Sequence, residues 1–207
     1  MEKISKKKLE RYPLYLAILK DAKKNGCQTL SAAYMAKQLN VSEELVRKDL
    51  QLISNTPGTP KAGRNIHDTI IEIEKFLGMS NQINAILVGV GNIGKALLAD
   101  SVYRNTGVHI MCAFDNNADL INRKFRNYEI FDIEKMPNFL ANANIQLVIL
   151  TTTAESAQGV CDILNQYDIK GIWNFSHAVI NVREGISVED VNFNSSLAKL
   201  CHNIRNN

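Results

Sequence analysis

The stretch "AILVGVGNIGKALL", residues 85–98, decides how the larger part of this chain folds. An apolar run suited to a buried strand leads into Gly89, Gly91 and Gly94, which match the pattern G-x-G-x-x-G, and a helix-forming run follows. In that pattern the first glycine makes a tight turn, the second lets a pyrophosphate approach the backbone, and the third lets helix and strand pack closely. The N-terminus of the helix then offers free N–H groups to phosphates. The stretch therefore predicts a dinucleotide-binding turn.

Asp115 supports this interpretation, because it ends the next predicted strand, 21 positions beyond Gly94. A carboxylate at that place accepts hydrogen bonds from ribose hydroxyls and repels a 2′-phosphate. No Arg or Lys follows until Arg123, so we expect NAD(H) rather than NADP(H). The alternative is a Rossmann-like domain whose cleft is empty or serves another purpose.

Strand and helix patterns alternate from residue 83 onward. We predict strands at 84–88, 108–114, 145–151 and 171–174, and helices at 92–100, 135–142 and 154–166. Strands separated by helices imply parallel βαβ units, and so an α/β fold with a doubly wound parallel sheet. Ligands of such sheets bind outside the carboxyl ends of the strands. Thr151, Thr152 and Thr153 lie at such an end, although one of them can simply cap the helix that begins at Ala154.

The first 80 residues differ in charge. They carry 14 Lys and Arg against 9 Asp and Glu, a net charge of +5, whereas residues 81–207 have a net charge of −2. An excess of positive charge in a small domain favours a polyanionic partner. A solvated, lysine-rich surface is the alternative.

The helices predicted in this part form a helix-turn-helix pattern. The first, at 8–25, contains Pro13, which either lies in its first turn or bends it, and two more begin after Ser31 and Ser42. The last of them, "SEELVRKDLQLIS" at 42–54, has an apolar stripe at spacings i, i+4 and i+7. Its other side can reach base edges and phosphates in a major groove. The residues that we expect there are Ser42, Arg47, Lys48 and Gln51.

Residues 55–65, "NTPGTPKAGRN", combine turn-forming prolines and glycines with Lys61 and Arg64. After a helix-turn-helix this predicts a β-hairpin wing on the DNA backbone, and a flexible interdomain loop is the alternative. A helix at 67–79 follows. We expect a winged-helix domain at 1–80, a Rossmann domain at 81–194, and a C-terminal helix and tail at 195–207, with Ser195 or Ser196 as the helix cap. The apolar side of that helix can dock on a partner subunit or pack on its own sheet.

Composition excludes several classes of protein. The longest apolar runs, such as "LVIL" at 147–150, are too short to span a bilayer, and we see no signal peptide. Cys27, Cys112, Cys161 and Cys201 are scattered without a C-x-x-C pair. We therefore expect no metal site and no disulfide, but buried free thiols in a reducing cytoplasm.

A hydride-transfer enzyme would need an acid or base beside its substrate. His109 and Lys170 lie at the wrong ends of strands, and His177, which follows a strand, has no recognisable partner. The chain also has no separate substrate domain, so we predict that it is not an enzyme. The alternatives are an NAD-dependent dehydrogenase with an accessory N-terminal domain, and a repressor that senses another nucleotide, such as one carrying coenzyme A.

The chain resembles the Rex redox-sensing transcriptional repressors of bacteria. The matching segments are "RYPLYL" at 11–16, "VRKDL" at 46–50, "GVGNIGKAL" at 89–97, "AFD" at 113–115, "ILTTTAESAQ" at 149–158, "GIWNFSHAVINV" at 171–182 and "VEDVNF" at 188–193. The resemblance implies a homodimer with a C-terminal helix exchanged between subunits. It also implies a repressor that binds a double-stranded DNA operator with NAD⁺ and releases it when NADH binds.

The chain departs from the family's pattern at the wing and at the switch. The family's wing ends in Lys/Arg-Gly-Val-Gly-Tyr, and Arg64 stands at the tyrosine position. The family's switch uses an Arg, a Tyr and an Asp, and the aligned residues here are Ala17, Ser101 and Asn192. We therefore expect NAD(H) binding with weaker discrimination between NADH and NAD⁺.

Together, the residues and the resemblance predict two sites. The predicted nucleotide site consists of Gly89, Val90, Gly91, Asn92, Ile93, Gly94, Asp115, Asn116, Thr151, Thr152, Thr153, Asn174 and Ser176. The predicted DNA-binding site consists of Ser42, Arg47, Lys48, Gln51, Lys61 and Arg64.

Overall fold

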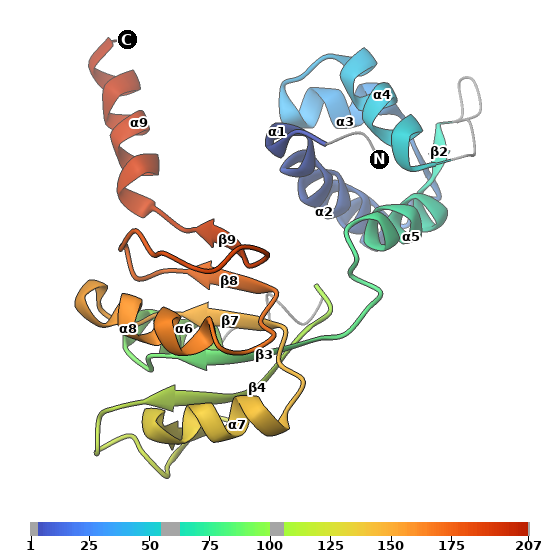
Figure 1. The fold of residues 1–207 in the computed structure, drawn as a ribbon. Helices are drawn as coiled ribbons and strands as arrows, with labels where there is room; N and C mark the ends of the chain where they lie inside the picture. The colour runs from blue at the N-terminus through green and yellow to red at the C-terminus, as the bar shows by residue number, and fades with distance from the viewer. Residues whose placement is uncertain (1–3, 55–62, 100–105, 207) are drawn as a thin grey trace. The chain divides into compact units, whose positions relative to one another are not determined.

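The computed structural model describes residues 4–54, 63–99 and 106–206 (Figure 1). The chain divides into two compact units, Met1–Asn81 and Gln82–Asn207.

The N-terminal unit is a small helical domain with a two-stranded sheet. Its helices are α1 (Lys6–Leu9), α2 (Arg11–Lys24), α3 (Ala32–Leu39), α4 (Glu43–Ile53) and α5 (Ile66–Phe76), and strand β1 (Thr29–Leu30) pairs antiparallel with β2 (Arg64–Asn65). Pro13 is the third residue of α2, so it lies in the first turn, where a missing N–H leaves no hydrogen bond unmade. The short sheet closes the segment that contains α3 and α4.

Serine caps begin both helices of the predicted helix-turn-helix. The hydroxyl of Ser31 accepts from the N–H of Tyr34 at 3.1 Å, and that of Ser42 accepts from the N–H of Leu45 at 3.3 Å. Between them Asn40 adopts a left-handed conformation with φ of 51°, which ends α3 and turns the chain into α4. The predicted helix-turn-helix is therefore present.

The second unit is built on a seven-stranded sheet. Strand order is β5 (Lys124–Phe125), β6 (Tyr128–Asp132), β4 (Val108–Asp115), β3 (Ile83–Val88), β7 (Leu147–Leu150), β8 (Gly171–Asn174) and β9 (Ser187–Asp190). Every pairing is parallel except that of β5 with β6. From β6 to β9 this is the 3-2-1-4-5-6 order of a dinucleotide-binding fold. The predicted doubly wound α/β sheet is confirmed, and β5, β6 and β9 are additions that we did not predict.

Alternate residues of the central strands face two separate apolar layers. Ile86 and Val88 of β3 pack with buried residues of α7 (Met136–Asn142) and α8 (Ala154–Leu164). Ala85 and Leu87 face the opposite way and pack with Leu98 of α6 (Asn92–Ala99). A single helical turn, η2 (Ile133–Lys135), precedes α7. Both faces of the sheet are thus covered, which explains why its central strands are continuous apolar runs.

The turn between β3 and α6 has no room for side chains at two glycines. Gly89 has a φ of +98°, and a Cβ there would lie 2.7 Å from the carbonyl carbon and oxygen of Thr151. A Cβ on Gly94 would lie 2.2 Å from the carbonyl oxygen of Gly89. The first and third glycines of the motif therefore permit the turn and the close start of α6, as the motif predicts.

The C-terminal helix, α9 (Phe193–Asn206), begins two residues earlier than predicted. Its cap is Asn192, whose side-chain oxygen accepts from the N–H of Ser195 at 2.9 Å, so the prediction of Ser195 or Ser196 as the cap is wrong. No residue of α9 is buried, and its large apolar residues, Phe193, Leu197, Leu200 and Ile204, are more than half exposed. The alternative that it packs on its own sheet is therefore not what the structure shows.

The cysteines correct another expectation. Cys112 and Cys161 are buried, and burial raises the pKa of the Cys112 thiol to about 12 and that of Cys161 to about 11. Cys27 and Cys201 are exposed, so the expectation of four buried thiols holds for only two of them.

No described helix has the length and apolar composition to cross a lipid bilayer.

Replacing Gly94 with Ala tests the close packing of α6. Because the new Cβ would meet backbone rather than a movable side chain, we expect Gly94→Ala to lower the free energy of unfolding by about 1–3 kcal/mol or more. The matched control is Gly159→Ala on α8, where a Cβ meets nothing within 4 Å. That change should raise stability by about 0.5–1 kcal/mol. Denaturant unfolding curves measure both, and equal effects of the two variants would contradict the role given to Gly94.

Candidate nucleotide and nucleic-acid sites

A cavity of about 390 Å³ opens where β3, β4 and β7 end. The carboxyl ends of these strands are aligned, since Val88 of β3 pairs with Phe114 of β4 and with Leu150 of β7. This is the edge at which doubly wound sheets bind ligands. The lining residues are Gly89, Val90, Gly91, Lys95, Asp115, Asn116, Asn117, Leu120, Ile133, Thr151, Thr152, Thr153, Ser156 and Val160.

Asp115 holds two loops of the cavity in place. The residue is 9% exposed, and its carboxylate accepts from the N–H of Val90 at 2.5 Å and from the N–H of Asn117 at 2.8 Å. The first bond fixes the glycine turn, and the second fixes the turn after β4. Each carboxylate oxygen has a further lone pair that can accept from a hydroxyl of a ligand. The predicted ribose acceptor thus also supports the phosphate-binding turn.

The three threonines after β7 differ in what their hydroxyls do. Thr151 donates to the carbonyl of Gly89 at 2.6 Å and so joins the end of β7 to the glycine turn. Thr153 stands at the cap position of α8, but its hydroxyl caps no backbone N–H and instead bonds to that of Ser156 at 3.3 Å. The hydroxyl of Thr152 is buried without a hydrogen-bond partner among the described residues. Buried polar atoms are usually paired, so the unpaired Thr152 hydroxyl in this lining suits a site that binds a ligand.

Lys95 is a cavity residue that the sequence analysis missed. It is half-buried, and no described residue pairs with its ammonium group. Its backbone N–H bonds to the carbonyl of Gly91 at 2.9 Å, in the first turn of α6. Helical side chains point toward the N-terminus of their helix, so the ammonium group can reach back toward the phosphate-binding end. The signal was present, because a cation directly follows the glycine motif.

The remaining predicted nucleotide residues do not line the cavity. Asn92 and Ile93 lie in the first turn of α6, which presents backbone N–H groups. Asn174 is buried, and its amide group donates to the carbonyl of Ala178 at 2.9 Å and to Asp190 at 2.8 Å. Ser176 donates to the side-chain oxygen of Asn174 at 2.6 Å. These last two polar groups are therefore used within the chain, where they hold the loop after β8.

The lining fits a phosphate-bearing nucleotide. A Cβ on Gly91 would meet nothing within 4 Å, so the backbone there is open to a ligand. Among the described lining residues, the Lys95 cation and the open N-terminus of α6 suit phosphate, and the Asp115 carboxylate suits ribose. The unpaired Thr152 hydroxyl suits a further polar group of the ligand.

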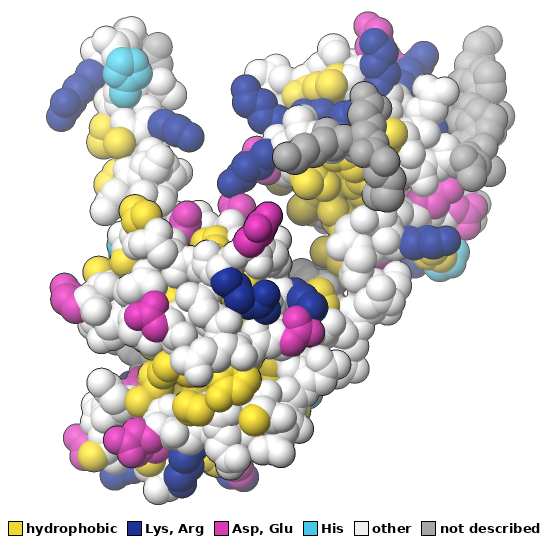
Figure 2. Space-filling model, viewed as in Figure 1, with side chains coloured by type: hydrophobic (Ala, Val, Ile, Leu, Met, Phe, Trp, Pro, Cys, Tyr) yellow, Lys and Arg dark blue, Asp and Glu magenta, His cyan; other side chains and the backbone are white. Residues whose placement is uncertain are grey.

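Helix α4 presents the predicted DNA-binding residues on its exposed side. The side chains of Arg47 and Lys48 are each 70% exposed, and Gln51 is also exposed. Each cation is paired with an acid one turn earlier, Arg47 with Glu43, and Lys48 with Glu44 at 2.7 Å. Figure 2 shows dark blue Lys and Arg side chains spread over the helices of this unit.

The wing is described only at its end. Residues 55–62, with Lys61, lie outside the described residues, and so does Ser101 of the switch positions. Arg64 is half-buried on β2 and pairs with Leu30 of β1. Of the other switch positions, Ala17 is exposed on α2, and Asn192 is the cap of α9.

The candidate acid and base residues are scattered. His109 lies at the amino end of β4, and Lys170 is paired with Asp168 before β8 begins. His177 is exposed, adopts a φ of 61° and lies edge-on to Phe193, with ring centroids 6.1 Å apart. Among the described residues, no group of His, Cys, Asp and Glu could hold a metal ion.

A helix-turn-helix unit and a dinucleotide-type cavity in one chain define a class of protein: a DNA-binding regulator with a nucleotide-binding domain. The comparisons with known proteins identify the family. Residues 3–51 match the family described as "Putative DNA-binding protein N-terminus", and residues 80–178 match "CoA binding domain". The redox-sensing transcriptional repressor Rex of Clostridium botulinum strain Hall is 33% identical over 197 residues, 95% of this chain and 93% of the relative. The chain therefore belongs to the Rex family of redox-sensing transcriptional repressors, which confirms the resemblance noted in its sequence.

Other relatives and solved structures agree. Rex of Carboxydothermus hydrogenoformans is 33% identical over 98% of this chain and 97% of its own length. The crystal structure of RSP in complex with β-NAD⁺ and operator DNA matches all of this chain and 94% of RSP, with a TM-score of 0.91 and 27% identity. RSP in complex with β-NADH matches with a TM-score of 0.89 and 26% identity, covering all of this chain and 96% of RSP. The predicted fold class is confirmed over the whole chain.

Proposed function

We propose that this protein is a transcriptional repressor that binds operator DNA and senses NAD(H). The single observation that carries the proposal is the cavity at the glycine turn, with its unpaired Thr152 hydroxyl, in a chain that also presents a recognition helix with exposed Arg47 and Lys48 side chains. The relatives support it, since RSP is a Rex-family repressor solved with NAD⁺ and operator DNA and with NADH. The protein would act in the cytoplasm and would read the nucleotide without converting it.

The cavity residues divide the work of holding the dinucleotide. The N–H groups at the start of α6, with Lys95, would bind the pyrophosphate, and the open backbone at Gly91 would let it approach. Asp115 would accept from the adenosine ribose, and Thr152 would bond toward the other half of the molecule. When bound, the nucleotide supplies a nicotinamide ring, which is positively charged in NAD⁺ and neutral in NADH. A ligand shifts a conformational equilibrium only by its differential affinity for the two states.

Two copies of the chain would form the active repressor. One winged-helix unit offers few base contacts, so two half-sites are needed for useful specificity. The exposed apolar residues of α9 would supply the contact with the second subunit, because a helix with an apolar stripe needs a surface to cover it. Phe193, at the start of that helix, lies near Phe175 of its own subunit, with ring centroids 6.5 Å apart.

Experiments distinguish the proposed function from two others, a dehydrogenase and a sensor of a coenzyme A nucleotide. A dehydrogenase would consume NADH with a suitable carbonyl substrate and would lose that activity on His177→Ala. A repressor that senses a coenzyme A nucleotide is the other alternative, which the family described as "CoA binding domain" makes worth testing. Calorimetry with NADH, NAD⁺ and coenzyme A distinguishes these, and the proposal requires binding of NADH. Binding of coenzyme A alone would overturn it.

The switch positions lead to a prediction about redox discrimination. We expect NADH to release the operator at lower concentration than NAD⁺, but with a ratio about tenfold smaller than in a Rex protein with Arg, Tyr and Asp at these positions, because hydrogen bonds to charged groups contribute about 1.5–3 kcal/mol. Titration of an operator complex with each nucleotide measures the ratio. Restoring the three residues (Ala17→Arg, Ser101→Tyr and Asn192→Asp) should increase it. An unaltered chain that already discriminates by orders of magnitude would contradict the prediction.

Lys48→Ala tests the DNA-binding face of α4. We expect weaker operator binding and a log–log salt slope that falls by about one unit for each phosphate that the variant no longer neutralises. Lys124→Ala is the matched control, since Lys124 is 67% exposed and paired with Glu129 but lies in the other unit. If both variants behave alike, or if salt has no effect, α4 is not the DNA-binding element.

The apolar stripe of α9 predicts how the dimer can be broken. Leu200→Glu places a charge in the stripe, and we expect monomers, because covering each leucine there contributes about 1.5–3 kcal/mol and covering an unpaired charge is unfavourable. Asn203→Glu adds the same charge outside the stripe and should leave dimers. A chain truncated after Asn194 should give monomers or insoluble protein. Light scattering reports the mass of each, and a soluble dimer of the truncated chain is incompatible with this role for α9.

A further inference from the structure

A buried carboxylate lies inside the helix-turn-helix. Asp49 is fully buried on α4, between Val46 and Leu50, which form the apolar side of that helix. An isolated carboxylate is strongly disfavoured inside an apolar core unless opposite charges and hydrogen-bond donors pair with it. It directly follows Lys48, one of the residues that we assign to the DNA-binding face.

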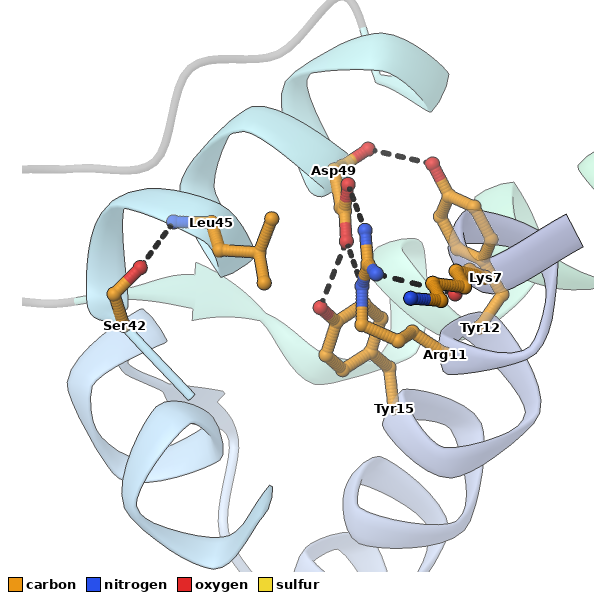
Figure 3. A network of polar contacts seen from close by, with 7 residues as sticks. All are labelled: Lys7, Arg11, Tyr12, Tyr15, Ser42, Leu45 and Asp49. Atoms are coloured by element: carbon orange, nitrogen blue, oxygen red, sulfur yellow. Dashed lines mark hydrogen bonds and ion pairs between the residues drawn. The ribbon is translucent and has the colours of Figure 1, made fainter. Parts of the chain in front are cut away.

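Among the described residues, the groups that pair with Asp49 come from α2 (Figure 3). Arg11 donates through Nε to Oδ2 at 2.6 Å and through Nη2 to Oδ1 at 3.0 Å, a two-pronged contact with the carboxylate. The hydroxyl of Tyr15 donates to Oδ2 at 2.9 Å, and that of Tyr12 donates to the backbone carbonyl of Asp49 at 2.9 Å. Arg11 also donates to the carbonyl of Lys7 in α1 at 3.1 Å.

The pKa values of Arg11, Tyr12 and Tyr15 keep all three side chains protonated, as donors to Asp49 must be. Burial raises the pKa of Tyr15 to about 12, with the Asp49 carboxylate as the second cause, and burial likewise raises that of Tyr12 to about 12. Asp49 raises the pKa of Arg11. Both phenols are therefore proton donors at neutral pH, and the guanidinium keeps its charge.

We propose that Asp49 and its partners Arg11 and Tyr15 are positioning residues that set the rotation of the recognition helix, and so determine operator selectivity without touching DNA. This inference rests on the proposed DNA binding. Apolar packing has no preferred direction, so the stripe of α4 alone tolerates small rotations of the helix. A guanidinium that meets both carboxylate oxygens fixes distance and direction together.

The expected sensitivity follows from helix geometry. A helix with side chains has a diameter of about 10–12 Å, so a rotation of roughly 20° moves an outward side chain by about 2 Å. That displacement is enough to break a hydrogen bond to a base edge. Attraction to phosphates depends less on direction, so it would survive the same rotation.

The test compares two conservative variants of the network with a matched core variant. Tyr15→Phe removes one hydroxyl, and Arg11→Lys keeps the charge but cannot make the two-pronged contact. Ile73→Val on α5 trims a fully buried residue of the same core that has no bond to Asp49. The probes are a duplex that the wild-type protein enriches from a random-sequence pool, and an unrelated duplex of equal length. Each protein is measured at a temperature where its unfolding curve shows it folded.

We expect Tyr15→Phe and Arg11→Lys to lower the ratio of affinities for the selected and unrelated duplexes by about tenfold, the effect of breaking one hydrogen-bonded pair between a side chain and a base. Affinity for the unrelated duplex, its salt dependence and NADH binding should stay at wild-type values. Ile73→Val should leave the ratio unchanged. The inference is overturned if the network variants keep the ratio, or if Ile73→Val lowers it equally. A wild-type protein that selects no duplex would instead overturn the proposed function.

Discussion

The contact between Gly94 and the carbonyl oxygen of Gly89 is the constraint on which the nucleotide-binding unit depends. Helix α6 begins directly against the end of β3 because position 94 has no side chain, since a Cβ there would lie 2.2 Å from that oxygen. A helix that begins at this edge presents its unpaired N–H groups where the strands end. Two other strands hold the same turn, through the Thr151 hydroxyl at Gly89 and the Asp115 carboxylate at Val90. The cavity therefore depends on the ends of β3, β4 and β7, which meet at the glycine turn.

Local patterns made much of this fold predictable. The central strands are covered on both faces and so appear as apolar runs, whereas β9 lies at the sheet edge, with most of its side chains exposed, and has no such run. The sequence also grouped the glycine turn with Asp115 and the threonines. Lys95 was missed although it directly follows the glycine motif, because its place in the cavity depends on the direction of a helical side chain. Asp49 was hidden for another reason. It stands among charged residues that a helix normally exposes, and its partner Arg11 lies 38 positions away.

A buried carboxylate performs the same task in each unit. Asp115 accepts from two backbone N–H groups, and Asp49 accepts from a guanidinium and a phenol. Burying either charge is costly, and each carboxylate offsets that cost by pairing with donors that would be left unpaired without it. An apolar residue in its place would also lack direction. In both places the carboxylate joins segments that must keep a fixed relation to a ligand: the glycine turn to the end of β4, and the recognition helix to α2.

The exposed charges of α4 favour DNA contacts that depend on the direction of this helix. Arg47 and Lys48 are each paired with a glutamate one turn earlier, so the outward face of the helix has little net charge before DNA arrives. Exposed pairs of this kind contribute about 0–1 kcal/mol, so a phosphate or a base can replace the glutamate easily. The glutamates nevertheless repel the DNA backbone, and this lowers affinity for every sequence. Binding must then rely more on contacts to base edges, which depend on direction, and a helix held firmly by Asp49 can provide that direction.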